Sequence, residues 1–308
     1  MFIEKRPALS RWRRVPAALA ALYLLTLPPV VARAQEASQL ATAFVKVDTG
    51  LTLQYVAQGD PRGPVVVLLH GAGDSWHSWD LALPLLPKST RVYSLTMRGH
   101  GLSDHPKEGY ARADFAADIT SFLKKMDLRD VTLVGHSLGS LVAQVVTQND
   151  AEGRITRLVL IGSGPGRAPD PDKPSELSAY FASVKDPISY EFARDFQAGT
   201  SAIPLPPQFL ETMIGEVQRV PAAMFHALAK SDADPQHVEK LRRIRAKTLL
   251  LWGDQDAMFS RADQDALLGI IPGSKLVAYP GTGHALHWEQ PAKFVRDLVA
   301  FMAPAKAR

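Results

Sequence analysis

The chain has no cysteine, no long uninterrupted apolar run and no repeated segment. Without cysteine it forms no disulfide, carries no thiol nucleophile and offers no cysteine for lipid attachment, so its stability must come from a packed core. The apolar stretch at 15–31 contains three prolines and is short of the about 20 residues that cross a bilayer. With 308 residues, 46% of them hydrophobic, the chain is long enough for one large or two small globular domains.

The amino terminus has the pattern of an export leader. Five basic residues precede the apolar stretch, and Ala32-Arg33-Ala34 supplies the small residues that a signal peptidase reads. We expect residues 1–34 to be a cleaved signal peptide and the mature protein to be periplasmic or secreted, without a stable membrane anchor. An uncleaved anchor is the alternative, and Arg13-Arg14 leaves a twin-arginine route open beside general secretion.

Removal of this leader changes the charge balance. The whole chain has 35 Lys and Arg against 31 Asp and Glu, but residues 1–34 contain six bases and one acid, which leaves 29 bases and 30 acids, a net charge of −1. The sequence therefore predicts no nucleic-acid partner.

Strand and helix patterns alternate along most of the remaining chain. Two alternating segments, 44–47 and 51–56, flank Asp48-Thr49-Gly50 and predict a hairpin. Six apolar runs follow that are typical of buried parallel strands: 65–69, 91–96, 131–134, 158–161, 248–252 and 275–279. Helical spacing lies between most of them, at 114–126, 138–148, 261–270 and 291–301. This alternation predicts an α/β fold with a mostly parallel sheet flanked by helices.

One interval interrupts the alternation. From about 164 to 245 the chain is rich in proline and in helix-compatible apolar residues, without a clear strand. We expect a helical cap there, inserted between core segments 35–163 and 246–308. Such a cap would cover the carboxyl edge of the sheet, where open α/β sheets bind ligands.

The strongest chemical signal is Gly135-His136-Ser137-Leu138-Gly139, directly between a predicted strand and a predicted helix. This is a G-x-S-x-G elbow, in which small residues permit a tight turn that lifts the serine above the sheet. The amide of Leu138, at the helix amino terminus, would face developing negative charge. A serine hydroxyl needs a base to become a nucleophile, and the base needs an orienting acid.

Candidates for both partners follow later in the chain. His284 lies in a glycine-rich loop after the last predicted strand, and Asp254 and Asp256 end the strand before it. The order serine, acid, histidine is the one expected for this elbow.

These motifs resemble the α/β-hydrolase fold family, over about residues 44–301, in the branch of serine esterases and lipases with a helical cap. The resemblance also uses His70-Gly71-Ala72-Gly73, the Arg98 to Ser103 segment, and Trp288 to Pro291. It implies an eight-stranded sheet, Asp256 as the triad acid with Asp254 as the alternative, and Ala72 as the donor of a second oxyanion amide beside Leu138. Thr96 departs from the aspartate often found two residues before the arginine.

We therefore expect a serine hydrolase that cleaves a small-molecule carboxylic ester, or a lactone or related acyl bond, through an acyl-enzyme, with no metal or organic cofactor. Cofactor-free haloperoxidases, carbon–carbon bond hydrolases and acyltransferases share the triad and stay open as alternatives, as does a non-catalytic binding or receptor protein. Dehalogenases and epoxide hydrolases of this fold have an aspartate at the nucleophile position. The serine at position 137 therefore argues against both activities.

The other histidines and the cap aromatics have less specific interpretations. We expect His70, His100 and His136 to support loops, and the spacing of His284 and His287 is weak evidence for a metal. The large apolar residues of the cap and of the first crossover are expected mainly in packing, with some lining a pocket. They are Trp76, Trp79, Tyr180, Phe181, Phe192, Phe196, Phe209, Met213, Met224 and Phe225.

Overall fold

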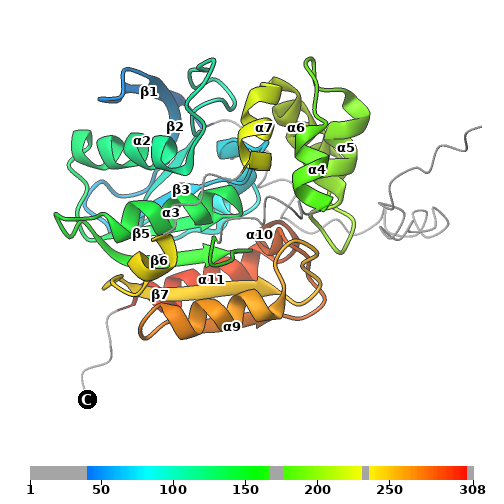
Figure 1. Ribbon diagram of the computed structural model, residues 1–308. Helices are drawn as coiled ribbons and strands as arrows, with labels where there is room; N and C mark the ends of the chain where they lie inside the picture. Colours follow the sequence, from blue (N-terminus) through cyan, green and yellow to red (C-terminus); the bar gives the residue numbers. More distant parts are fainter. Residues whose placement is uncertain (1–39, 167–175, 231–235, 304–308) are drawn as a thin grey trace, which may run out of the picture.

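A computed structural model describes residues 40–166, 176–230 and 236–303. Its centre is an eight-stranded sheet in the order β1-β2-β4-β3-β5-β6-β7-β8 (Figure 1). The first two pairings, β1 with β2 and β2 with β4, are antiparallel, and all the others are parallel. The strands are β1 (Thr42–Lys46), β2 (Thr52–Gln58), β3 (Val65–Leu69), β4 (Arg91–Leu95), β5 (Val131–His136), β6 (Ile155–Ile161), β7 (Lys247–Gly253) and β8 (Lys275–Tyr279).

The apolar runs of the sequence are confirmed as the parallel strands, and the central ones are buried on both faces, whereas β8, at the edge of the sheet, is partly exposed. Along β3, Val67 and Leu69 face one core cluster, while Val66 and Leu68 face the other. Every one of these four side chains has no exposed surface. In a strand that is covered on both sides, polar and apolar residues do not alternate.

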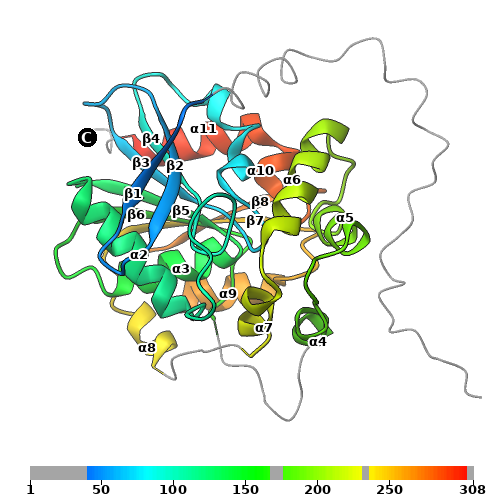
Figure 2. The same ribbon diagram turned by 90° about the horizontal axis from the view of Figure 1, so that it is seen from above.

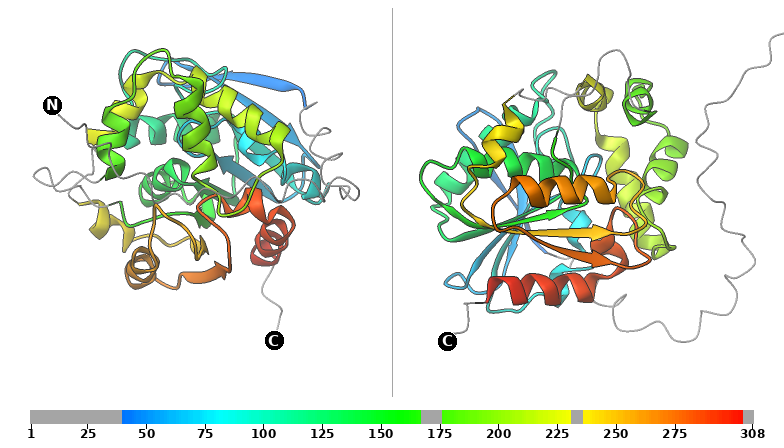
Figure 3. Two further views of the ribbon diagram at one scale, coloured as in Figure 1. Left: turned by 90° about the vertical axis from the view of Figure 1, so that its right-hand side faces the viewer. Right: turned by 60° about the horizontal axis from the view of Figure 1, so that its bottom comes forward.

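Helices cover both faces of the sheet. The first cluster includes side chains from α2 (Arg112–Lys125), α3 (Leu138–Gln148) and α9 (Arg261–Ile270). The second includes η3 (Trp76–Trp79), η4 (Leu83–Leu85) and α11 (Pro291–Met302). Figure 3 shows α9 and α11 on opposite sides of the sheet. The predicted layered α/β architecture is therefore confirmed.

The cap consists of α4 (Glu176–Ala182), α5 (Tyr190–Ala198), α6 (Pro207–Arg219) and α7 (Ala222–Lys230). Helix α4 packs on α7 and α5 on α6, and the four gather beside the end of the sheet toward which the parallel strands point (Figures 1 and 2). Between β6 and β7 the described residues form helices and no strand, and the return to the core passes through α8 (His237–Leu241).

The predicted signal peptide, residues 1–34, lies outside the described residues. Within the described ranges, no helix has both the length and the apolar character needed to span a bilayer.

Candidate active site

Ser137 occupies the turn between β5 and α3. Its φ of 51° and ψ of −119° lie in a region that non-glycine residues rarely adopt, and such strain is concentrated at functional sites. The turn is too tight for side chains on either side: a Cβ at Gly135 would lie 2.2 Å from the carbonyl oxygen of Gly139, and one at Gly139 would lie 2.4 Å from that of Leu69. The two glycines are therefore required by backbone contact, as the elbow motif predicts.

His284 and Asp256 come together from the loops after β8 and β7. The Nδ1 atom of His284 lies 3.0 Å from Oδ2 of Asp256, and both side chains are buried. The other carboxylate oxygen accepts hydrogen bonds from the amides of Met258 (2.8 Å) and Phe259 (3.0 Å). Burial opposes ionisation of Asp256, but the charge of His284 and these hydrogen bonds outweigh it and lower the pKa of the carboxyl. Asp256 is thus an ionised acceptor that fixes the imidazole.

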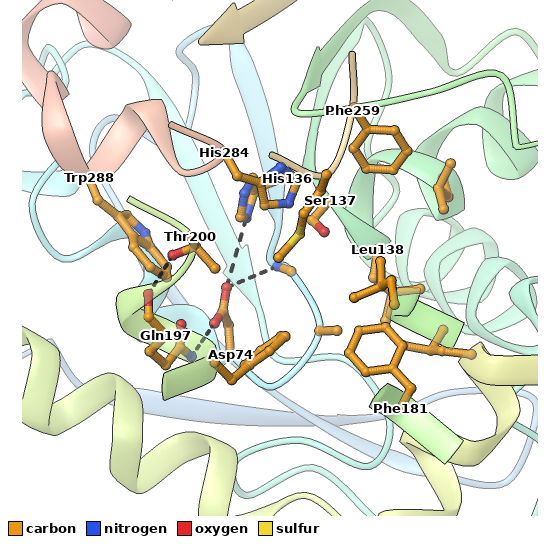
Figure 4. A pocket seen from close by; sticks show the side chains of 17 residues that line it. Asp74, His136, Ser137, Leu138, Phe181, Gln197, Thr200, Phe259, His284 and Trp288 are labelled. Carbon is orange, nitrogen blue, oxygen red and sulfur yellow. Dashed lines mark hydrogen bonds and ion pairs between the residues drawn. The ribbon is translucent and has the colours of Figure 1, made fainter. Parts of the chain in front are cut away.

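The other nitrogen of His284 is available for chemistry. Nε2 is buried and has no hydrogen-bond partner among the described residues. Ser137 and His284 line the same pocket, beneath the cap (Figure 4). The structure therefore brings together the serine, the histidine and the acid that the sequence singles out.

The alternative acid, Asp254, has a different surrounding. Its carboxylate accepts a 2.7 Å hydrogen bond from the amide of Gly281 and one of 3.1 Å from Gln255, and the residue is exposed. These contacts tie the β7 and β8 loops together. The carboxylate paired with His284 is that of Asp256.

Ala72 and Leu138, whose amides are the candidate oxyanion donors, line the same pocket. Neither amide donates to another group within the described part of the chain. The turn that carries Ala72 is held on both sides, because the Gly71 amide donates to Asp74 (3.2 Å) and the Gly73 amide to Nε2 of His100 (3.2 Å). Leu138 opens α3, where amides have no intrahelical acceptor. Both donors suit an oxyanion.

His70 and His100 support this turn, as expected. Nδ1 of His70 donates to the Gly71 carbonyl (2.8 Å), while its Nε2 accepts from the Met97 amide (2.9 Å). Burial, and then the charge of His100, lowers the pKa of His70 well below its usual value, so the ring is neutral. A neutral ring can donate from one nitrogen and accept at the other.

Two polar pocket residues were missed by sequence reasoning. Asp74 follows the His-Gly turn and is 2% exposed, and Gln197 of α5 is fully buried; Nε2 of Gln197 donates to Oδ1 of Asp74 at 2.9 Å (Figure 4). Burial raises the pKa of Asp74 to about 6, against the effect of its hydrogen bonds. The position of Asp74 directly after the His-Gly-Ala-Gly turn was a usable signal for it. Gln197 belongs to no motif.

His136 also lies in the pocket wall, and not merely beside a loop. Its ring centroid is 4.8 Å from that of His284 and 4.5 Å from that of His287. Burial and the charges of these two neighbours lower the pKa of His136 well below its usual value. Three adjacent imidazoles cannot all be charged, so His136 is a neutral packing partner of the catalytic candidate.

The apolar candidates divide between pocket and core. Phe181 and Phe196 line the pocket, whereas Trp76 and Trp79 belong to the core beneath the sheet. Phe225 is fully buried and packs against Phe196, with ring centroids 5.8 Å apart. Within the described ranges no group of His, Asp and Glu is arranged to hold a metal ion.

Comparisons with known proteins identify the family of this chain. The profile of the "Alpha/beta hydrolase family" matches residues 66–298. The 2-hydroxy-6-oxo-2,4-heptadienoate hydrolase of Pseudomonas putida is 28% identical over 82% of this chain and 92% of its own. Epoxide hydrolase 3 of Xenopus tropicalis is 25% identical, over 82% and 76% of the respective chains.

Solved structures give the same fold. An esterase from Exiguobacterium antarcticum superposes with a TM-score of 0.76 at 24% identity, over 84% of this chain and 98% of its own. The family profile covers most of the chain and spans the turn of Ala72, the elbow of Ser137 and the loops of Asp256 and His284. The chain belongs to the alpha/beta hydrolase family.

Proposed function

We propose that this protein is a serine hydrolase that cleaves small carboxylic esters, with Ser137 as nucleophile, His284 as base and Asp256 as orienting acid. One observation carries the proposal: His284 is fixed by Asp256 through Nδ1 while its buried Nε2 is unpartnered among the described residues, in the pocket that Ser137 also lines. Acyl transfer requires a nucleophile, a base that takes its proton, and a group that orients the base.

In the first step, Nε2 of His284 accepts the proton of the Ser137 hydroxyl as the oxygen attacks the ester carbonyl. The carbonyl oxygen becomes an oxyanion and accepts hydrogen bonds from the amides of Ala72 and Leu138. Loss of one such donor typically costs about 3 kcal/mol of transition-state stabilisation. The imidazolium, stabilised by Asp256, then protonates the leaving alkoxide, which departs as an alcohol.

In the second step, water attacks the acyl group on Ser137. His284 takes a proton from the water and returns it to the serine oxygen as the carboxylic acid leaves. Neither step calls for a group beyond the five residues named.

The pocket favours small substrates. Its cavity volume is about 160 Å³, and Leu138, Phe181 and Phe196 are among the side chains that enclose it. An apolar cavity of about 150 Å³ holds a molecule the size of benzene. We therefore expect activity on esters of short acids, with acyl chains of about four carbons, and little on long-chain lipids.

Other reactions use the same constellation. The similarity to a 2-hydroxy-6-oxo-2,4-heptadienoate hydrolase makes carbon–carbon bond cleavage the second candidate. Epoxide hydrolysis is disfavoured, although relatives from Xenopus tropicalis and Mus musculus bear that name. In that reaction the elbow residue of the fold is an aspartate, and here it is Ser137.

The test is hydrolysis of nitrophenyl butanoate together with labelling by a fluorophosphonate. We expect turnover and a single label on the native protein, and the loss of both in Ser137→Ala. Ser183→Ala, a change at an exposed serine of the cap, is the control and should behave as the native protein. Labelling without turnover on esters, lactones, amides or thioesters would instead favour the carbon–carbon hydrolase, and no labelling would favour a binding protein.

A further inference from the structure

We propose that one end of the pocket is a polar subsite, formed by Asp74 and Gln197, that accepts a hydroxyl or amino group carried by the leaving alcohol of the substrate. The inference rests on the proposed ester hydrolysis, because only that reaction defines a leaving alcohol. It identifies the substrate class as esters of short diols or amino alcohols.

The first argument is the bonding of Asp74. Its Oδ1 accepts from Gln197 (2.9 Å), and its Oδ2 accepts from the amide of Gly71 (3.2 Å) and the hydroxyl of Ser78 (3.1 Å). A carboxylate has about four lone-pair sites. These three donors therefore leave it capacity for one more, and they hold it in a fixed orientation.

The second argument is the hydrogen-bond acceptor of Gln197, its Oε1 atom, which is unpaired within the described ranges. Both hydrogens of its amide nitrogen are used, toward Asp74 and toward the Met213 carbonyl (3.4 Å). Its Oε1 atom is buried and has no hydrogen-bond partner among the described residues. An unpaired buried acceptor is costly, and a ligand that donates a hydrogen bond to it removes that cost. Asp74 and Gln197 together present acceptors, so the matching ligand group is a donor.

The third argument is the position of this pair relative to the triad. Figure 4 shows Asp74, Gln197 and Trp288 on the His284 side of Ser137, whereas Leu138 and Phe181 lie on the other side. Contacts agree with this view, because His136 lies close to both His284 (4.8 Å between ring centroids) and Asp74 (3.9 Å from Nδ1 of His136 to Oδ2 of Asp74). The histidine must protonate the leaving oxygen, so the leaving alcohol extends toward the polar end and the acyl group toward the apolar end.

The same arrangement defines what the subsite rejects. A leaving group that ends in a carboxylate would bring a second anion against the buried Asp74. An alkyl end would leave Oε1 of Gln197 unpaired and the remaining acceptor site of Asp74 unused. A site built to hydrogen-bond a hydroxyl discriminates strongly against the analogue that lacks it.

Binding to the Ser137→Ala protein tests the subsite without turnover. The probes are 2-hydroxyethyl butanoate and propyl butanoate, which differ by a hydroxyl in place of a methyl group. Ligand-observed NMR titration should give at least tenfold tighter binding of the hydroxy ester. Adding Asp74→Asn or Gln197→Leu should bring the ratio to about one or below, while Gln208→Leu, at an exposed glutamine of α6, should leave it unchanged.

Using the ratio of two ligands cancels any general weakening caused by a variant. A third probe, propyl 3-hydroxybutanoate, has its hydroxyl on the acyl side and should bind no better than propyl butanoate. Equal binding of the first two probes, a ratio that survives both pocket variants, or a gain from the acyl-side hydroxyl instead would each overturn the subsite. Hydrolysis of the two butanoates by the native protein is measured in parallel, and absence of turnover with a normal binding ratio would refute the proposed function and not the donor-binding site.

Discussion

The Nδ1 atom of His284 lies 3.0 Å from Oδ2 of Asp256, although the two residues come from different loops. The loops meet because β7 and β8 are parallel neighbours, so that both chains leave the sheet at the same edge. The amides of Met258 and Phe259 hold the second carboxylate oxygen, which fixes the direction in which Asp256 faces the imidazole. The orientation of the proposed base therefore depends on the sheet register and on one short turn.

Replacing Asp256 by asparagine should lower kcat for nitrophenyl butanoate by about 10³- to 10⁴-fold, because an amide cannot stabilise the imidazolium and favours the wrong tautomer. Asp254→Asn is the matched variant, two residues away and exposed, and should lose less than tenfold. Steady-state kinetics on both proteins decide the assignment. The reverse order of losses would make Asp254 the acid.

Gly139→Ala should destabilise the fold and abolish activity. The new methyl group would lie 2.4 Å from the Leu69 carbonyl oxygen, a backbone atom that cannot move aside alone. Overpacking of this kind costs about 1–3 kcal/mol. Gly215→Ala, in α6, meets nothing within 4 Å and should raise stability by about 0.5–1 kcal/mol. Urea unfolding of the two variants measures the contrast, and equal effects would contradict the tight elbow.

Asp74→Asn should raise stability at neutral pH. Because the folded pKa of Asp74, about 6, lies above its usual 3.8, the folded state binds more protons between these values, and stability falls as pH rises from about 4 to 6. Above pH 6 the ionised carboxylate lowers the free energy of unfolding by up to about 3 kcal/mol. The facing titratable groups, His136 and His284, remain in both proteins.

The measurement is urea unfolding of Asp74→Asn and the native protein at pH 4 and pH 8. The variant should be more stable than the native protein at pH 8 and about equally stable at pH 4. A gain of the same size at both pH values would mean that Asp74 is not held at a raised pKa.

Phe196→Ala and Phe225→Ala should act on different properties. Phe196 lines the pocket, so its truncation should extend the accepted acyl chain beyond butanoate, as measured by kcat/KM across a chain-length series. Phe225 is fully buried behind it and should chiefly cost stability, about 3–5 kcal/mol. Unchanged chain-length preference in Phe196→Ala would show that this ring does not limit the acyl site.

The sequence by itself determined the layered core. The runs at 65–69 and 275–279 and the helical pattern at 138–148 match β3, β8 and α3 residue for residue, because short apolar runs between turn residues and longer stretches of helical spacing differ in their periodicity. It also predicted the elbow at Ser137, because glycine is required where a Cβ would meet the backbone, as at Gly135 and Gly139.

Only the tertiary structure decided which distant groups meet. The position of Asp254 and Asp256 at the end of one strand leaves both open, and only the resemblance to the family favours Asp256; the turn that directs Asp256 at His284 depends on the register of β7 with β8. Gln197 belongs to a helix whose pattern predicts packing alone, yet the placement of the cap over the sheet brings it to Asp74, 123 positions away. Contacts of such separation arise from chain folding in three dimensions, which no local pattern of residues encodes.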